Sequence, residues 1–356
     1  MKKNLIIGIF ILTLFPWLLP AQPINAADPP ITWKVQTPFA KELWGYKAAQ
    51  IWADDVLRMS GDRMKIDLLE TVRGEMPGDV VGAVQKGVRD AGYTSPGFDT
   101  QKIPAAALFG SSPAFFDLLG YFTWMQAYGG KDLLQEIYGN SVKIFPAGMS
   151  WGKVGMWATK KVETMADLKG KKVASSSKFL ENIYAEEGAS VVTAGRGLGA
   201  IFALTGGTLE AVDAASTPIL DLKLGFHKFT QYAYFPSLQM VAGYSAVYVN
   251  NAKWEALPAD LQVIVVEACN AANAKSFTHW LLEDAKAIKL LKEQGKPAVT
   301  KFSPQMQQEI LNRLLAQYDA VSDPLFQKVW KSQKEFMKIY VPYMELQKVD
   351  AVVNLK

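Results

Sequence analysis

Few residues in this chain are of types that carry out chemistry, and their spacing builds no common catalytic or metal site. His227 and His279 are the two histidines and Cys269 is the one cysteine among 356 residues. The usual zinc site needs three or four His, Cys or acidic ligands held together, which two isolated histidines cannot supply. A disulfide-stabilised scaffold is excluded because it needs many cysteines.

Two short motifs suggest enzyme sites, but each lacks essential parts. Residues 195–199 (GRGLG) have neither the GxGxxG spacing of a dinucleotide loop nor the Lys-Ser/Thr of a P-loop, so they predict a plain strand-to-helix turn. Ser175, Ser176 and Ser177 lack the flanking glycines of a nucleophile elbow. We therefore expect a protein that is not an enzyme, with a secreted hydrolase as the alternative from that class.

Composition and charge indicate a folded protein without a nucleic-acid partner. The chain is 49% hydrophobic and 12% aromatic, which excludes intrinsic disorder, and its length suggests two domains. With 38 basic and 34 acidic residues, its net charge is too small to attract nucleic acid.

The first 26 residues have the pattern of a secretory signal peptide. Lys2 and Lys3 precede an apolar run over 5–19, and small residues follow before position 27. The apolar run is shorter than the roughly 20 residues of a membrane helix, which disfavours the alternative of a retained anchor. We expect cleavage near Ala26 and an exported protein without a lipid anchor, because no cysteine lies beside that site.

The mature chain alternates between strand and helix patterns, which predicts an α/β fold. A strand over 31–35, a helix over 41–60, a strand over 64–69 and a helix over 79–86 form the first unit, and a second α/β unit begins near residue 142. Residues 258–293 predict one long helix, because no Gly and no further Pro follow Pro258 before its end. Further helices are expected over 305–321 and 324–340.

Residues 97–122 are rich in Pro, Gly and Ser and predict loops, yet they carry many aromatic side chains. Together with the next few residues they supply Phe109, Phe115, Phe116, Tyr121, Phe122, Trp124 and Tyr128. Such residues pack in a core or form the apolar wall of a ligand pocket, and the sequence leaves both open.

Several segments, in order, resemble the DctP-type solute receptors of TRAP (tripartite ATP-independent periplasmic) transporters. Residues 164–173 (TMADLKGKKV) are similar to the family's "s.eDlkGlK.R" segment, residues 188–192 (GASVV) to "lGA.pv", and residues 203–213 (ALTGGTLEAVD) to "aLq.G.idg.e". Residues 221–228, 232–236 and 128–130 look most like the branch that binds 2-oxo acids with a cation. Residues 257–262 (LPADLQ) resemble the start of the family's long helix.

This resemblance implies an α/β periplasmic solute-binding protein fold. Two α/β lobes with central sheets are joined by hinge strands and a long bracing helix, and the ligand cleft lies between the lobes. The ranges are 1–26 for the signal peptide, 27–150 for the first part of lobe 1, 151–243 for lobe 2, 244–300 for the return to lobe 1 and the bracing helix, and 301–356 for the C-terminal helices.

Three positions depart from the family's binding site. In the family an arginine binds the solute carboxylate with its planar, bidentate donors, and Ala174 stands at that place here. A Gln that helps to hold the cation and solute corresponds to Lys153, and a Glu-Trp pair falls on Asp213 and Ala214. The usual carboxylate clamp is therefore not expected.

We hypothesise that the Lys153 ammonium replaces both the guanidinium and the cation, with Asp213 as its counter-charge. The alternative is that Lys153 is an ordinary solvated lysine and Asp213 an ordinary turn acid. Whether Na⁺ or Ca²⁺ binds in the ligand site stays open, and Asp213 is the metal ligand predicted for that case. A third candidate for the positive charge, Arg196, is expected to point away from the cleft.

The other predicted ligand-binding residues are small, apolar or aromatic and come from both lobes. On the second lobe they are Trp157, Ser175, Leu238, Gln239 and Met240, with Ala215, Ser216 and Tyr244 as further wall residues. On the first lobe they are Ser95, Gly97 and Phe98, of which Phe98 either stacks on the ligand or packs in the core. Such a wall favours a monocarboxylate with an apolar or aromatic body.

The resemblance implies a receptor that closes over one small organic acid and delivers it to the TRAP membrane permease. The alternative is a receptor-fold protein that binds an uncharged or apolar ligand or acts as a sensor partner, because the family arginine is missing. The C-terminal helix 324–340 and the tail after it carry much apolar surface. They pack on their own lobes or form a homodimer through the C-terminal helices, as in members of the 2-oxo-acid branch.

Overall fold

The computed structural model describes residues 29–70, 79–111, 115–194, 197–213 and 216–348. The predicted signal peptide, and among the predicted site residues Arg196, Ala214 and Ala215, lie outside the described residues. Among the described helices, none combines the length and the apolar character that crossing a bilayer requires.

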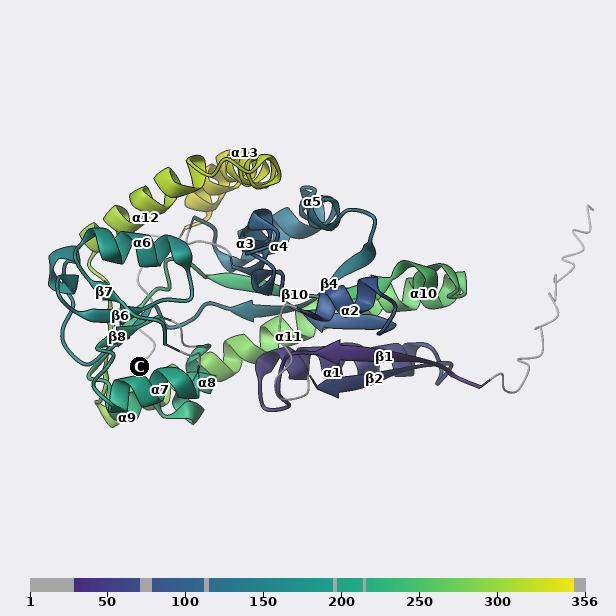
Figure 1. Cartoon of the computed structure of the whole chain (residues 1–356), viewed down its shortest axis with the longest axis horizontal. Coiled ribbons are helices and arrows are strands. Elements are labelled where there is room, and N and C mark those ends of the chain that lie inside the picture. Colours follow the sequence, from purple (N-terminus) through teal and green to yellow (C-terminus); the bar gives the residue numbers. More distant parts are fainter. Residues whose placement is uncertain (1–28, 71–78, 112–114, 195–196, 214–215, 349–356) are drawn as a thin grey trace, which may run out of the picture.

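The strands form two separate sheets. Sheet A has the order β2 (Met64–Glu70), β1 (Ile31–Thr37), β3 (Ala91–Thr94), β10 (Ala242–Asn250) and β4 (Val142–Trp151). Sheet B has the order β11 (Ala298–Lys301), β9 (Tyr232–Phe235), β5 (Met156–Ala158), β8 (Ala211–Val212), β6 (Lys172–Ala174) and β7 (Ser190–Val191). We call the body around sheet A the first lobe and that around sheet B the second lobe (Figure 1).

Strand direction is mixed in both sheets. In sheet A, β1 runs parallel to β2 and β3, whereas β10 runs antiparallel to β3 and β4. In sheet B, β6 runs parallel to β7 and β8, β11 runs parallel to β9, and β5 runs antiparallel to both β8 and β9. The mixed α/β class predicted from the sequence is confirmed.

Helices cover both sheets (Figure 1). Those of the N-terminal half are α1 (Trp44–Met59), α2 (Val80–Gln85), α3 (Ala107–Gly110), α4 (Leu118–Ala127), α5 (Gly130–Tyr138), α6 (Lys178–Glu186) and the short 3₁₀ turns η2 (Pro96–Phe98), η3 (Pro104–Ala106) and η4 (Met165–Leu168). The later ones are α7 (Leu198–Thr205), α8 (Pro218–Leu224), α9 (Phe226–Phe229), α10 (Asn251–Glu255), α11 (Ala259–Gln294), α12 (Pro304–Asp319) and α13 (Pro324–Gln347).

The chain passes between the lobes through two links and through α11, and it returns to the first lobe through α12 and α13. One link, residues 152–155, joins β4 to β5, and a second, residues 236–241, joins β9 to β10. The third route is α11, whose 36 residues extend roughly 54 Å at 1.5 Å per residue and run along both lobes (Figure 1). This helix matches the one predicted over 258–293.

Polar side chains of α11 attach it to β4 beside a β-bulge. The β4–β10 register shifts between Ser245 and Ala246, which disturbs the regular ladder opposite Pro146. Asn273 donates its Nδ2 to the Pro146 carbonyl at 2.8 Å, and the Ser276 Oγ accepts the Met149 amide at 3.1 Å. Both side chains are fully buried, so α11 satisfies backbone groups that the bulge would otherwise leave unpaired.

Several elements differ from the sequence-based expectation, among them α4 and β11. The helix α4 begins within the region predicted as loops and extends beyond it; its apolar residues surround the helix and give no amphipathic stripe. The short strand β11 was not predicted, and its pairing with β9 places residues 298–301 in the sheet of the second lobe. The predicted range 244–300 therefore ends inside a strand of the other lobe.

The aromatic residues of this region lie mainly in the core. Phe109, Phe116, Tyr121 and Trp124 are buried, and the Phe116 ring stacks on Phe336 of α13 at a centroid distance of 5.9 Å. They provide the surface on which the first half of α13 packs against its own lobe.

Closely packed glycines hold η2 against the end of α3, and the end of α3 against the hinge strand β10. A Cβ on Gly110 would lie 2.3 Å from the Gly97 backbone, and a Cβ on Gly243 would lie 2.7 Å from the Gly110 carbonyl oxygen. Because the colliding atoms belong to the backbone, no side-chain rotation relieves the overlap.

We expect Gly110→Ala to lower the free energy of unfolding by about 1–3 kcal/mol, because the added methyl group pushes η2 away from its neighbours. Gly199→Ala is the control. Gly199 lies in α7 with open space around the added methyl, and that change should be neutral or stabilise by up to about 1 kcal/mol. Urea unfolding of the three proteins measures both effects, and equal stability of the Gly110 variant and the wild type would contradict the packing argument.

Candidate functional site

A buried carboxylate lies at the centre of the polar cluster on the second lobe. Asp213 follows β8 directly, is 1% exposed, and its backbone amide donates to the Ala174 carbonyl at the end of β6. Its Oδ2 accepts the Ser175 hydroxyl at 2.9 Å, and its Oδ1 accepts the Ser176 amide at 3.0 Å. The ends of two neighbouring parallel strands thus meet at this carboxylate.

Burial has the largest effect on the pKa of the Asp213 carboxyl group. Removal from water raises the pKa of Asp213 to about 6, although the positive charge of Lys153 and the hydrogen bonds from Ser175 and Ser176 act to lower it. A nearby negative charge on Glu181 raises the pKa further. The carboxyl group therefore changes charge close to neutral pH.

Lys153 and Gln239 reach the same hydroxyl from the two links between the lobes. The Lys153 Nζ donates to the Ser176 Oγ at 2.6 Å, and the Gln239 Nε2 donates to the same oxygen at 3.2 Å. The links also touch directly, since the Lys153 amide donates to the Met240 carbonyl at 3.4 Å. Each of the two links therefore supplies one hydrogen-bond donor to the Ser176 hydroxyl on the second lobe.

A second buried carboxylate supports the segment that follows Asp213. Asp221 on α8 is fully buried, accepts the Ser216 amide at 2.7 Å and the Trp157 Nε1 at 2.8 Å, and has its pKa raised by burial to about 7. Asp284 on α11 accepts the Ile219 amide at 2.9 Å, and burial raises its pKa to about 6. The bracing helix is thereby attached to the second lobe through α8.

Several predicted ligand contacts are core residues in this structure. Trp157 is fully buried and stacks on Phe226 at 5.8 Å, Ala174 packs in the same apolar cluster, and Leu238 belongs to the largest core cluster. These side chains therefore pack in the core that supports the site. Met240 is half-buried, and its Cε lies 2.6 Å from the position that a Cβ on Gly243 would take.

The predicted residues of the first lobe form their own group. The Ser95 Oγ donates to the Tyr244 carbonyl at 3.1 Å and accepts the Gly97 amide at 3.3 Å, which caps η2. Phe98 is half-buried and packs on Phe39 at a centroid distance of 5.9 Å. This contact with Phe39 gives Phe98 a packing role.

The structure thus brings together Lys153, Ser175, Asp213 and Gln239, and adds Ser176, which the sequence analysis did not select as a ligand contact. The only signal in the sequence was its place between Ser175 and the helix that begins at Lys178. Its importance follows from the directions of its hydrogen bonds, which no spacing reveals.

The cluster does not suit a metal held by carboxylates. No group of three or more His, Cys, Asp or Glu side chains that could hold a metal is found in the described part of the chain. Both carboxylate oxygens of Asp213 accept hydrogen bonds from protein donors, and the Lys153 charge acts on the same carboxylate. Asp213, the predicted metal ligand, is therefore the centre of a hydrogen-bond network with protein donors.

A hollow of about 300 Å³ lies elsewhere on the second lobe, over β9 and β11. Tyr232, Tyr234, Lys161 and Lys301 are among the residues that line it, and the Lys161 ammonium is paired with the Glu163 carboxylate at 2.6 Å. None of the residues predicted for ligand binding lies there.

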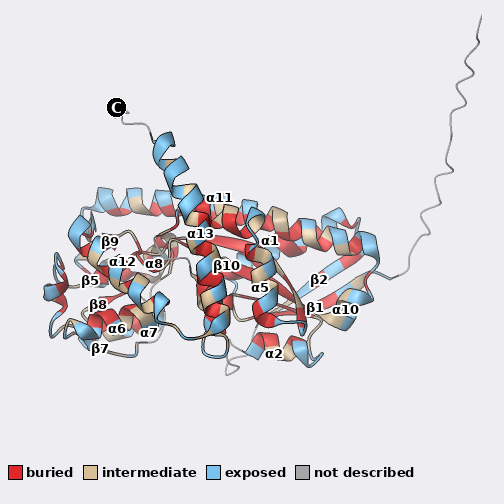
Figure 2. Cartoon of the chain, turned by 90° about the horizontal axis from the view of Figure 1, so that it is seen from above, coloured by how far each residue is buried: buried red, intermediate tan, exposed pale blue. Residues whose placement is uncertain are grey.

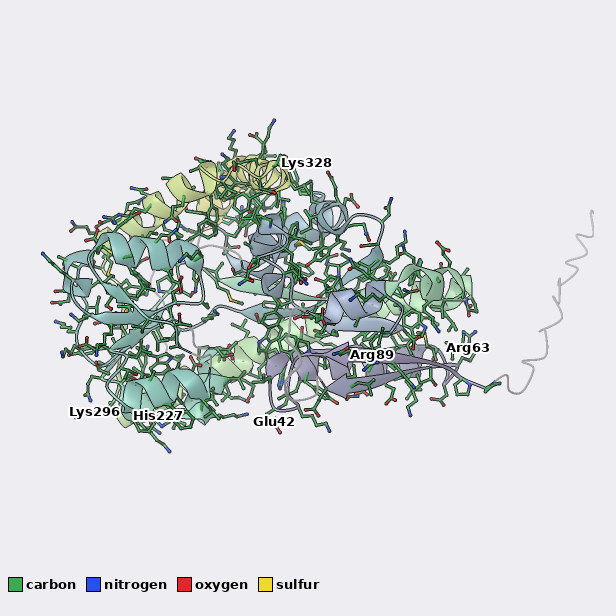
Figure 3. The ribbon with its side chains drawn as sticks, viewed as in Figure 1. Glu42, Arg63, Arg89, His227, Lys296 and Lys328 are labelled. Atoms are coloured by element: carbon green, nitrogen blue, oxygen red, sulfur yellow. The ribbon has the colours of Figure 1, made fainter. Side chains whose placement is uncertain are left out.

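The labelled side chains of His227 and Lys296 lie at the outer edge of the same lobe, far from the first lobe (Figure 3).

Comparison with known proteins agrees with this architecture. The sequence model of bacterial extracellular solute-binding protein, family 7 (DctP), matches residues 39–323. The chain is 29% identical over 330 residues to a protein of Nostoc sp. (strain PCC 7120) named monocarboxylate 2-oxoacid-binding periplasmic protein, covering 88% of this chain and 86% of that one.

Solved structures share the fold. A TRAP periplasmic solute-binding protein of Colwellia psychrerythraea with bound calcium and pyruvate gives a TM-score of 0.81 at 22% identity, covering 89% of this chain and 97% of that one. One from Pseudoalteromonas atlantica T6c with bound sodium and pyruvate gives 0.79 at 23% identity, with coverage of 89% and 97%. A TRAP transporter solute-binding protein of Bordetella bronchiseptica RB50, a mixed-occupancy dimer with calcium and picolinate, gives 0.79 at 21% identity, with coverage of 90% and 95%.

Family membership follows from the extent of the match, because the family model spans most of the chain. The chain therefore belongs to the DctP family of bacterial extracellular solute-binding proteins, which are binding proteins and not enzymes.

Proposed function

We propose that this protein is the periplasmic receptor of a TRAP transporter and captures a small monocarboxylate, with a 2-oxo acid as the first candidate. The observation that carries the proposal is the convergence of Lys153 and Gln239 on Ser176, beside the links that join the lobes. The relatives add support, because the Nostoc protein is named for monocarboxylate 2-oxo acids and two similar structures hold pyruvate.

In this proposal Lys153 anchors the ligand carboxylate. An ammonium provides a full charge and up to three donors, and a charge-assisted hydrogen bond to a carboxylate is about twice as strong as a neutral one. Asp213 balances the ammonium in the empty site, so the charge is not buried unpaired. The ligand then brings a second negative charge, which replaces Asp213 as the main partner of Lys153.

Ligand capture would draw the lobes together. The anchor lies on one of the links, and the first lobe presents η2 with Ser95 and Phe98 near the start of the hinge strand β10, the end that follows the second link. A ligand that contacts both lobes binds the closed form more tightly and increases its population. The closed form is the state that we expect the membrane permease to recognise.

The proposed function requires that the protein is exported. We infer that residues 1–26 are removed near Ala26 and that the mature chain acts in the periplasm with the TRAP permease subunits as its membrane partner.

A homodimer is proposed as the functional assembly. The end of α13 extends beyond the body of the protein (Figure 2), and its apolar side chains are exposed: Ile339 by 62%, Val341 by 41%, Tyr343 by 59% and Leu346 by 83%. A second copy of the chain would cover this surface, and the dimer of the Bordetella protein supports such an assembly.

Replacing Lys153 by Met should weaken monocarboxylate binding by at least about 30-fold, because the anchoring charge is lost. Lys289→Met is the matched control, since that side chain is 78% exposed on α11 and should not affect binding. Isothermal titration with pyruvate, phenylpyruvate and branched 2-oxo acids, with EDTA or with added Na⁺ or Ca²⁺, measures the effect.

Unchanged affinity of the Lys153→Met variant would contradict Lys153 as the anchor. Binding of uncharged apolar compounds alone by the wild type would favour the alternative receptor with a different ligand class. Binding that disappears with EDTA and returns with Ca²⁺ would show that a cation is required and that Lys153 does not replace it.

The affinity for a monocarboxylate should fall as pH rises from 5 to 8. The ligand is ionised throughout this range, because α-carboxyl groups titrate at about 3.5. Asp213 and Asp221, with pKa values raised to about 6 and about 7, become negative within it and compete for the Lys153 charge. The protonated forms therefore bind the anion better, and binding takes up protons.

Asp213→Asn should flatten the lower part of this pH profile, because it removes the group that titrates near pH 6. Tryptophan fluorescence titrations at half-unit pH steps provide the measurement. An affinity that rises with pH in the wild type would contradict the proposed competition.

Leu346→Asp combined with Tyr343→Asp should convert the dimer to a monomer, because two charges are placed in the apolar interface. Gln347→Asp, which adds a charge to a neighbouring exposed polar position, is the control. Size-exclusion chromatography with light scattering gives the mass. A monomeric wild type at 100 μM would contradict the dimer.

A further inference from the structure

The Ser176 hydroxyl has a defined direction in this structure. A serine hydroxyl offers one hydrogen to donate and two lone pairs that accept. Both acceptor positions of Ser176 are taken, by the Lys153 Nζ at 2.6 Å and the Gln239 Nε2 at 3.2 Å. In the described part of the chain, no hydrogen bond donated by the Ser176 Oγ is found, so its proton is directed away from both partners.

The neighbouring Ser175 shows the contrast. Its hydroxyl donates to Asp213 at 2.9 Å and accepts the Ser177 amide at 3.0 Å, so both its donor and an acceptor position serve the fold. Ser176 is half-buried and remains partly open to solvent. Of these two serines, Ser176 is therefore the one whose donor can reach a ligand.

We propose that Ser176 and Gln239 determine specificity by placing hydrogen-bond donors beside the Lys153 ammonium, and that this selects 2-oxo acids against the 2-amino acids of the same carbon skeleton. The proposal rests on the proposed function of the site. It adds two residues with a stated role, and the feature they recognise is the atom bonded to carbon 2.

The physical reason lies in the difference between a carbonyl oxygen and an ammonium group. A 2-oxo acid offers acceptor oxygens at carbons 1 and 2, which match a set of donors. A 2-amino acid places three N–H donors and a positive charge at carbon 2, where they meet the Ser176 proton, the Gln239 amide and the Lys153 ammonium. Such a site discriminates both by attraction to the oxo acid and by repulsion of the amino acid.

Asp213 does not remove this discrimination. Its two oxygens are held by Ser175 and Ser176 on the side of the β6 end, and its side chain is almost fully buried. Each oxygen keeps a second lone pair, so it is the burial of the side chain, and not a lack of acceptor positions, that keeps an ammonium on the ligand away from Asp213. Gln239 is different, because a change to Glu replaces its Nε2 donor by an acceptor without changing its size.

Calorimetric titrations with three ligand pairs test the proposal: pyruvate with alanine, 3-methyl-2-oxobutanoate with valine, and phenylpyruvate with phenylalanine. The wild type should prefer the oxo acid of the best pair by at least 100-fold. Ser176→Ala should weaken oxo-acid binding about tenfold, and Ser176→Thr, which keeps the hydroxyl, should restore most of it. Gln239→Glu should narrow the preference at least tenfold, because the ammonium then meets an acceptor.

Thermal unfolding of each variant without ligand separates loss of folding from loss of recognition, and the oxo-to-amino ratio is a readout that a purely structural role leaves unchanged. Oxo-acid affinities of Ser176→Ala within twofold of the wild type, or an unchanged ratio in Gln239→Glu, would overturn this inference and leave the proposed function standing. A wild type that binds no monocarboxylate would overturn both, and equal affinity of the wild type for both members of each pair would overturn the selectivity.

Discussion

The buried carboxylate of Asp213 is the interaction on which the site depends. An isolated charge in a protein interior is strongly unfavourable, so the chain must supply donors around it. The Ser175 hydroxyl and the Ser176 amide do so, and together they determine the backbone path from β6 into α6. The Ser176 side chain is thereby placed where Lys153 and Gln239 meet it. One desolvated group on a strand end thus organises donors from three separate segments.

The same site is coupled mechanically to the connection between the lobes. Lys153 and Gln239 lie on the two links, and α11 is attached to β4 by Asn273 and to the start of α8 by Asp284. The two links and α11 therefore each lie close to the polar cluster or to the segment that supports it. A change in the position of one lobe alters the donor geometry at Ser176, and a ligand that prefers one geometry changes the balance between open and closed forms.

The parts of this structure that follow local rules could be predicted from the sequence, and the parts that depend on distant partners could not. The long helix was predicted because 36 residues contain no Gly or Pro, and α12 because Ser303 and Pro304 form a standard helix start. The strand β11 exists through its pairing with β9, and α4 lacks an amphipathic stripe. At the site, Lys153 and Asp213 were predicted from their correspondence to family positions, whereas Ser176 required hydrogen-bond directions.

The move of the positive charge from the end of β6 to a link changes what ligand binding can do. Ala174, at the family's arginine position, is buried in an apolar cluster with Trp157, so an anchor there would belong to the rigid body of the second lobe. Lys153 is instead carried by residues 152–155, which join the two sheets. A carboxylate held by this ammonium acts on a segment that must bend when the lobes move. In the proposed function, the charge that recognises the ligand is therefore also a charge on the hinge, which couples recognition to closure through a single side chain.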